Sequence, residues 1–152
     1  MKTFTRLLIF LFGLSLTVET FGACDVTATN MNFGNYDVFL STPVVTTGTI
    51  TVRCGVLDLG NVIISIGPSG NSGGFNPRQM KHSTKSDRLS YNLFTNSSMN
   101  SIWGNGTGGT ATVSCPVLLG APCARTVFAR VPQLQDVSVG SYNDTVVVTI
   151  TF

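Results

Sequence analysis

His82 is the only histidine among the 152 residues of this chain, and it lies in the polar stretch KHSTK. A hydrolase needs a nucleophile, a base and an orienting carboxylate that converge on one pocket. No G-x-S-x-G sequence occurs, and a histidine in a solvated loop is a poor general base. We therefore interpret His82 as a surface residue, and the sequence predicts no catalytic residue and no enzyme.

The carboxylates and glycines offer no better site. After residue 22 all six acidic residues are Asp and they are scattered, which gives little support for a glycosidase pair or a calcium loop. The stretch GNGTGG places Gly104, Gly106 and Gly109 at the G-x-G-x-x-G spacing. That motif binds phosphates where a helix follows it, whereas the strand pattern TATVSC follows it here. We interpret it as a turn between strands, and the sequence predicts no cofactor and no metal.

Trp103 stands directly before this turn and has two interpretations. It could be an aromatic that stacks on a ligand, or a core residue at the end of a strand. Its neighbours Ile102 and Gly104 favour the core.

The four cysteines follow the N-terminal apolar stretch and include no C-x-x-C pair, so with one histidine they do not fit a zinc site. In an exported chain disulfides are the default, and four cysteines allow three pairings. Cys115 and Cys123 flank PVLLGAP, whose Gly and Pro can fold the chain back, so we predict that these two pair locally. Cys24 and Cys54 would then form the second disulfide.

The N-terminus predicts export. A basic start is followed by the apolar run LLIFLFGLSL, which is too short to span a bilayer. We predict a signal peptide over residues 1–22 and a mature domain over residues 23–152, with Thr20 and Gly22 at the cleavage positions. A lipoprotein signal is the alternative, but lipidation of Cys24 would leave an odd number of cysteines.

The charge and hydropathy of the rest exclude several partners. Without Lys2, Arg6 and Glu19 the chain has seven basic and six acidic residues, which does not fit a protein that binds nucleic acid. No second apolar run approaches membrane-spanning length, so we predict no transmembrane segment after signal removal.

Composition and patterning predict an all-β protein. Residues 23–152 contain no Glu but much Thr, Ser, Val, Gly and Asn, so strand and turn formers dominate. Alternating stretches such as GTITVRC, RLSYNLFT and RTVFARV are separated by turn residues. About seven such strands favour one antiparallel β-sandwich domain. One stretch, NVIISIG, is continuously apolar, which is typical of a strand buried on both faces.

Residues 68–86 have the Gly, Pro, Asn and Ser density of a long exposed loop. The basic residues in and after this stretch are interpreted as a solvated cluster: Arg78, Lys81, Lys85 and Arg88.

The C-terminal stretch GSYNDTVVVTITF predicts a strand that runs to the last residue. A period of two places four apolar side chains on one face, namely Val146, Val148, Ile150 and Phe152. Nothing follows in the chain to cover that face.

Several of these stretches resemble a known family. FGNYDV, GTITVRC, LSYNLFT, IWGNGTGGT and GSYNDTVVVTITF look like the spore coat protein U domain over essentially the whole of residues 24–152. That family is similar to the subunits of archaic chaperone–usher pili. The resemblance implies an immunoglobulin-like sandwich that lacks its final strand, with Val146, Val148, Ile150 and Phe152 bordering a strand-acceptor groove. It also implies the disulfide between Cys24 and Cys54.

The resemblance further implies the partners and the destination of the chain. A periplasmic pilus chaperone would first fill the groove with its own strand, and at the outer-membrane usher a neighbouring pilus or coat subunit would replace it. We accordingly predict a structural subunit that is exported through the periplasm to the cell surface or beyond, in a pilus or a coat.

One feature departs from the pilin pattern. In the predicted mature chain only Ala23 precedes Cys24, whereas a donor strand needs roughly ten residues. The chain could therefore accept a strand but hardly donate one, as expected at an adhesive pilus tip. Two alternatives stay open: a protective coat protein that forms no pilus, and a small secreted carbohydrate-binding module or hydrolase.

Overall fold

The computed structural model describes residues 24–55 and 59–152. The predicted signal peptide and its cleavage site lie outside these ranges. The described residues form strands, turns and loops without a helix, so none of them belongs to a helix that could cross a membrane. The prediction of an all-β protein is confirmed.

The described residues contain nine strands, two more than the sequence pattern predicts. They are β1 (Asp25–Ala28), β2 (Val44–Arg53), β3 (Leu59–Ile66), β4 (Arg78–His82), β5 (Arg88–Phe94), β6 (Val113–Leu118), β7 (Cys123–Val131), β8 (Tyr142–Asn143) and β9 (Val148–Thr151).

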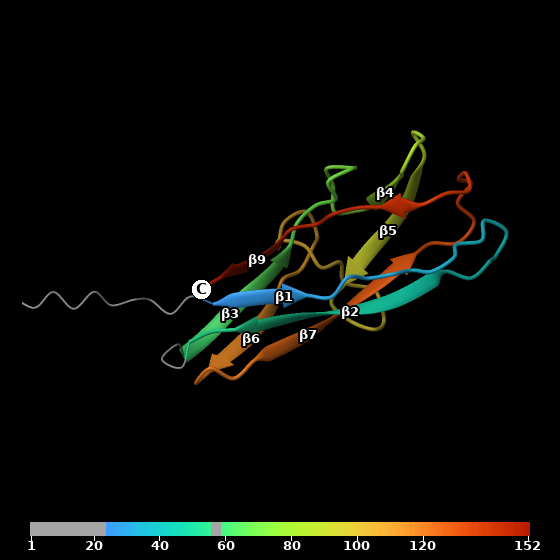
Figure 1. Cartoon of the computed structure of the whole chain (residues 1–152). Coiled ribbons are helices and arrows are strands. Elements are labelled where there is room, and N and C mark those ends of the chain that lie inside the picture. The colour runs from blue at the N-terminus through green and yellow to red at the C-terminus, as the bar shows by residue number, and fades with distance from the viewer. Residues whose placement is uncertain (1–23, 56–58) are drawn as a thin grey trace, which may run out of the picture.

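These strands form two antiparallel sheets that pack face to face (Figure 1). The larger sheet has the order β1-β2-β7-β5-β4-β8, and the smaller has the order β6-β3-β9. The longest pairing joins β2 to β7, from Val44 opposite Val131 to Val52 opposite Cys123. The result is the immunoglobulin-like sandwich that the sequence predicts.

The core lies between the two sheets and follows the period of two along the strands. Ile50 and Val52 of β2 are at most 2% exposed, and Val62 and Ile64 of β3 are fully buried. Trp103 is also fully buried, and its indole Nε1 donates a hydrogen bond to the carbonyl of Ile64 at 3.0 Å. Its interpretation as a core residue is confirmed.

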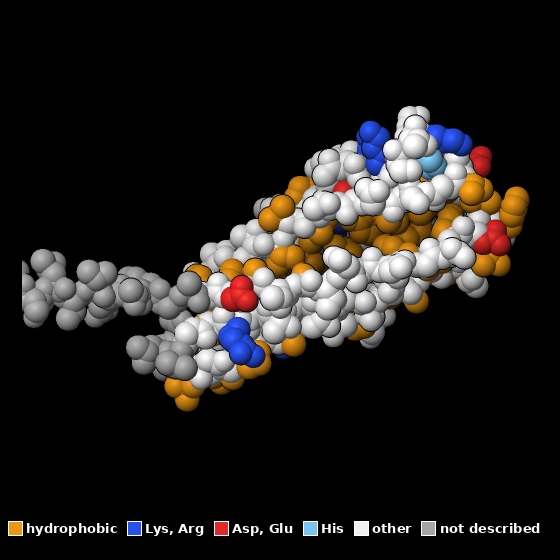
Figure 2. Space-filling model, viewed as in Figure 1, with side chains coloured by type: hydrophobic (Ala, Val, Ile, Leu, Met, Phe, Trp, Pro, Cys, Tyr) orange, Lys and Arg blue, Asp and Glu red, His pale blue; other side chains and the backbone are white. Residues whose placement is uncertain are grey.

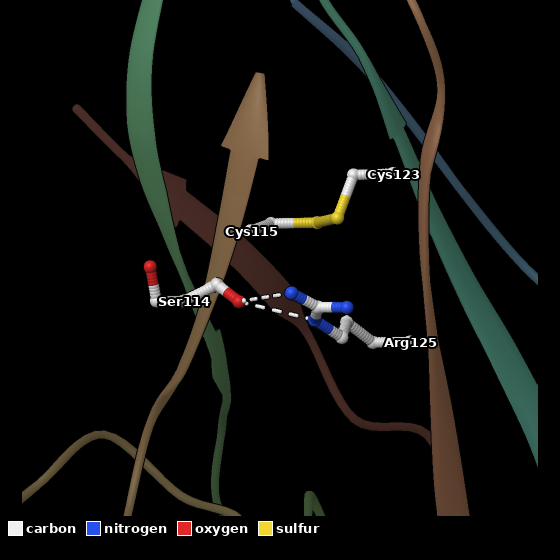
Figure 3. Close-up of a disulfide and its surroundings, with 4 residues drawn as sticks. All are labelled: Ser114, Cys115, Cys123 and Arg125. Atoms are coloured by element: carbon white, nitrogen blue, oxygen red, sulfur yellow. Dashed lines mark hydrogen bonds between the residues drawn. A yellow bond between two sulfur atoms is a disulfide. The ribbon is translucent and has the colours of Figure 1, made fainter. Parts of the chain in front are cut away.

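The structure contains two disulfides, Cys24–Cys54 and Cys115–Cys123, which are the two pairs expected from the sequence. The first joins the residue before β1 to the residue after β2, within the larger sheet. The second joins β6 to β7 and so links the two sheets. Beside it, the guanidinium of Arg125 donates two hydrogen bonds to the carbonyl of Ser114, from Nε at 3.0 Å and Nη2 at 2.9 Å (Figure 3).

The predicted exposed loop over residues 68–86 is wrong in its second half. Strand β4 lies there, paired with β5 on one side and β8 on the other. Arg78 begins β4 and is fully buried, and His82 ends it and is 5% exposed, so neither residue is the solvated surface group that the sequence suggested. The polar composition hid a strand whose buried polar groups find partners inside the fold.

Two further strand predictions need correction. The C-terminal stretch is not one strand, because β8 pairs with β4 of the larger sheet whereas β9 pairs with β3 of the smaller. The chain therefore crosses between the sheets over residues 144–147. Strand β3 is buried on one face only, since Ile64 is buried while the neighbouring Ile63 is 36% exposed.

Candidate functional site

Two adjoining hollows run along one side of the sandwich. The first, of about 390 Å³, lies between residues 28–33 and residues 142–148. The second, of about 680 Å³, lies between residues 31–39 and residues 137–142. Four side chains line both hollows, so the two form one continuous feature that we name the open groove: Met31, Phe33, Met80 and Tyr142. Figure 2 shows apolar side chains gathered along its length.

The first hollow of the open groove lies between edge strands of both sheets, since Ala28 at the end of β1 and Val148 at the start of β9 line it. β1 is an edge strand of the larger sheet and pairs with β2 alone. β9 is an edge strand of the smaller sheet and pairs with β3 alone. Each strand therefore keeps one side of its backbone without a neighbouring strand in the described part of the chain. Such an edge is a template for pairing with another strand.

The floor of the groove is the hydrophobic core itself. In the first hollow it includes Ile50, Ile66, Leu93 and Val127, each at most 2% exposed. These side chains come from both sheets, so the groove opens directly onto the interface between the two layers. The inward face of an inserted strand would therefore pack on apolar side chains of the groove.

The four residues predicted to border a groove have different positions. Val146 and Val148 line the first hollow. Ile150 is half-buried and packs against the core without lining that hollow. Phe152 lies past the end of β9 and is 76% exposed. Their role as a strand acceptor stays a prediction.

The wall of the groove contains a polar group that the sequence pattern did not single out. Asp144 lines the first hollow and is half-buried. Its Oδ2 accepts a hydrogen bond from the Tyr91 hydroxyl at 2.8 Å, and its Oδ1 accepts one from Asn71 Nδ2 at 3.0 Å. Burial, and then the hydrogen bond to Asp144, raise the pKa of Tyr91 well above its usual range. The sequence does contain a signal for Asp144, because the alternation that places Val146 and Val148 on the inward face also places Asp144 and Tyr142 there.

The sequence pattern also did not single out Phe33, which follows β1 in the chain and lies in one wall of the groove. Its ring contacts the ring of Tyr91 edge to face, with 5.9 Å between the centroids. Tyr91 therefore contacts Phe33 on one wall of the groove and Asp144 on the other. Only the tertiary structure brings these three residues together, since each belongs to a different segment.

Arg78 supports the region where the sheets meet. Its guanidinium donates hydrogen bonds to Asn92 Oδ1 at 2.9 Å and to the carbonyls of Gly67 and Trp103 at 2.8 Å each. Burial lowers the pKa of Arg78. Because Arg78 lies on β4 and Gly67 follows β3, this side chain ties the larger sheet to the smaller.

His82 holds the segment that leads into β8. Its Nδ1 accepts hydrogen bonds from the backbone N–H groups of Thr84 and Lys85, at 3.1 and 3.0 Å. Its Nε2 lies 3.1 Å from the carbonyl of Val139, to which it donates in the tautomer that leaves Nδ1 free to accept. The ring also packs edge to face on Tyr142, at 5.0 Å. Both ring nitrogens are thus used in holding local structure.

The glycine-rich stretch forms a turn between Trp103 and β6, as predicted. Gly106 and Gly109 have φ values of +86° and +78°, in the left-handed region that favours glycine. A side chain at Gly104 would collide with Thr110, because an added Cβ would lie 2.4 Å from its Oγ1. A strand follows this turn, so the context of a phosphate-binding motif is missing.

The fold and the groove together define an immunoglobulin-like β-sandwich that is open along one side. This chain belongs to the Spore Coat Protein U domain family, whose model matches residues 9–149. The resemblance stated from the sequence is therefore confirmed.

Two relatives show how far the similarity extends. "Protein U" of Myxococcus xanthus is 34% identical, over 92% of this chain and 83% of that protein. A chain in the crystal structure of the CsuC–CsuE chaperone–tip adhesion subunit pre-assembly complex, from archaic chaperone–usher Csu pili of Acinetobacter baumannii, is 27% identical with a TM-score of 0.59. That match covers 86% of this chain but spans only 40% of the length of the structural relative.

Proposed function

We propose that this chain is a structural subunit of a cell-surface assembly, and that its open groove accepts a β-strand from a partner. In this proposal a periplasmic chaperone fills the groove during export, and a neighbouring subunit fills it after assembly at an outer-membrane usher. The chain itself acts as an acceptor at the end of a pilus. In this proposal the chain acts by binding its partner non-covalently and does not catalyse a reaction.

The observation that carries this proposal is the position of the groove between two unpaired strand edges. A strand inserted there could pair through its backbone with β9, while its alternate side chains cover the apolar floor. Burial of each large apolar side chain contributes about 1.5–3 kcal/mol. Without an occupant, strand edges and half-buried apolar side chains of the groove walls, such as Met31 and Phe33, stay open to solvent, which favours aggregation.

The comparisons support a pilus as the assembly. The structural relative with a TM-score of 0.59 comes from a complex between a chaperone and a tip adhesion subunit. A terminal place also agrees with the predicted mature chain, in which a single residue precedes Cys24. Chaperone, usher, neighbouring subunit, surface location and tip position are all parts of this proposal.

A tethered strand tests the proposal without knowledge of the natural donor. A short turn and a strand of about nine alternating Val and Thr residues are added after Phe152, so that the strand can run back along residues 142–150. Periplasmic expression without a chaperone should yield little soluble monomer of the unextended chain. The extended chain should be soluble and monomeric, with a melting temperature higher by about 10 °C or more.

Matched variants locate the effect in the groove. An extension with Ser in place of Val should give no gain, because it covers no apolar surface. In the extended chain, Val148→Asp should abolish the gain, whereas Thr149→Asp, which changes an exposed neighbour, should retain most of it. A soluble, monomeric, protease-resistant unextended chain that gains nothing from the strand would contradict the proposal.

A coat protein that forms no pilus is the second candidate. The description of the family, a Spore Coat Protein U domain, favours it. Electron microscopy of the material secreted with the cognate neighbouring genes separates the two, since thin fibres support a pilus and an amorphous layer supports a coat.

A further inference from the structure

We propose that Asp144 selects the strand that fills the open groove. The inserted strand carries a side chain that donates a hydrogen bond, such as Ser or Lys, at the one inward position that faces Asp144. This inference rests on the proposed function, because it describes the partner of the same groove.

Asp144 is a polar exception in an apolar row. Going back along the chain from Ile150, every second residue turns inward, and the row reads Ile150, Val148, Val146, Asp144 and Tyr142. Val146 and Val148 line the same hollow as Asp144. An inserted strand with a strict apolar inward face would therefore place one apolar side chain against a carboxylate.

The carboxylate of Asp144 has hydrogen-bond donors at only some of its acceptor positions. It accepts three hydrogen bonds, from the Tyr91 hydroxyl, from Asn71 Nδ2 and from the backbone N–H of Thr145 at 2.9 Å. An ionised carboxylate has about four acceptor sites. One acceptor position therefore remains for a donor that enters the groove.

Insertion of a strand would shield this carboxylate from solvent, because Asp144 lines the hollow that the strand fills. A carboxylate that loses solvent without gaining a partner is unfavourable, whereas a hydrogen bond to a charged group contributes more than one between neutral groups. Two cations lie close to this network: Arg78 is fully buried and donates to carbonyl groups and Asn92, and Arg88 donates to the carbonyl of Asn71. Neither cation is among the three donors to Asp144, so a donor on the inserted strand would meet the remaining acceptor position.

The same contacts also give Asp144 a structural role, and the experiment must separate this role from the selection of a strand. Tyr91 lies on β5 and Asn71 lies in the loop after β3, so their bonds to Asp144 fix the place where the chain crosses between the sheets. Loss of that anchor would destabilise the protein whatever the occupant. The test therefore compares different tethered strands within one background.

The experiment uses the full chain with the tethered strand and changes one inward position at a time. At the position facing Asp144 the strand carries Val, Ser, Lys or Glu, and the melting temperature of each is measured. Ser and Lys should each exceed Val by about 3 °C or more, and Glu should be the lowest. At the position facing Val146, Val should be the best of the four.

Asp144→Asn provides the matched background, because it keeps the shape of the side chain and removes the charge. In that variant Lys should lose its advantage at the first position and Glu should lose its disadvantage, with no change in order at the second. Val equal to or better than Ser and Lys, or the same order in both backgrounds, would overturn the inference. If no tethered strand raises the melting temperature, the proposed function fails together with this inference. If the strands raise it but the order of side chains is not the expected one, only this inference fails.

Discussion

The two edges of the smaller sheet are finished in different ways. At one edge β6 turns directly into β7 of the larger sheet, and the Cys115–Cys123 disulfide and the Arg125–Ser114 hydrogen bonds hold the corner. At the other edge β9 faces the open groove, and no strand of the described residues pairs with the side of β9 that faces away from β3. The chain thus holds one edge by covalent and polar contacts within itself and leaves the other open, where we propose that a partner's strand is added.

This difference shows how an incomplete sandwich can still have a defined shape. The closed edge, together with Arg78 behind the groove, fixes the distance between the sheets without any contribution from an inserted strand. A groove of fixed width can then bind a strand without first being organised by it. Preorganisation of this kind lowers the cost of binding.

The largest effect is expected from Arg78→Met. The substitution leaves the carbonyls of Gly67 and Trp103 and the side chain of Asn92 without their buried donor. We expect a loss of roughly 3–5 kcal/mol in the free energy of unfolding, measured by urea denaturation of the strand-extended chain. Arg53→Met, at an exposed position at the end of β2, is the control and should change stability by less than about 0.5 kcal/mol. Equal effects of the two substitutions would show that the buried contacts of Arg78 are unimportant.

Removal of Cys24–Cys54 should have the next largest effect, because this disulfide anchors β1 at the border of the groove. The two cysteines are 30 residues apart, for which loop closure predicts a loss of about 3.5 kcal/mol. The Cys24→Ser/Cys54→Ser variant should also bind the tethered strand less well, seen as a smaller rise in melting temperature on extension. The same rise as in the unsubstituted chain would show that β1 keeps its place without the disulfide.

Removal of Cys115–Cys123 should cost less, since the cysteines are only eight residues apart. Loop closure predicts a loss of about 2.5 kcal/mol for the Cys115→Ser/Cys123→Ser variant. The hydrogen bonds of Arg125 remain and hold the corner, so the gain from the tethered strand should be unchanged. Addition of Arg125→Met should then reduce that gain, and failure to do so would contradict the assignment of Arg125 to the closed edge.

The sequence predicts the parts of this molecule that depend on local pattern. Alternation identifies the long strands, the spacing of Cys115 and Cys123 indicates a local pair, and the strand pattern after the glycines indicates a turn between strands. These signals are local because neighbouring residues produce them.

The parts that the sequence does not predict depend on contacts between distant segments. Arg78 and His82 read as loop residues because their own neighbourhood is polar, and their burial depends on carbonyl groups supplied by Gly67, Trp103 and Val139. The break between β8 and β9 is hidden for the same reason, since an alternating pattern continues unchanged while the pairing partner changes from β4 to β3. The alternating pattern is sufficient to identify Asp144 as an inward residue, but it does not identify Tyr91 and Asn71 as its hydrogen-bond partners.

The smallest effect is expected from Asp87, near the open edge. Its Oδ2 accepts a hydrogen bond from the backbone N–H of Ser138, in the segment that leads to β8. Hydrogen bonds from Ser138 lower the pKa of Asp87, so the folded state holds this proton less tightly than the unfolded state does. The stabilisation is therefore present above the unfolded pKa of about 3.9 and is lost as the pH falls through the lower, folded value.

Asp87→Asn should remove this part of the acid dependence. Melting temperatures of the two proteins between pH 6 and pH 2 should converge at the acid end, because the protonated carboxyl no longer differs in charge from the amide. Asp25→Asn, at an exposed position on β1, is the control. Since Ser138 also lines the second hollow, hydrogen exchange near residues 137–142 should increase at low pH in the unsubstituted chain before the closed edge responds. Simultaneous exchange at both edges would mean that the open edge has no separate local stability.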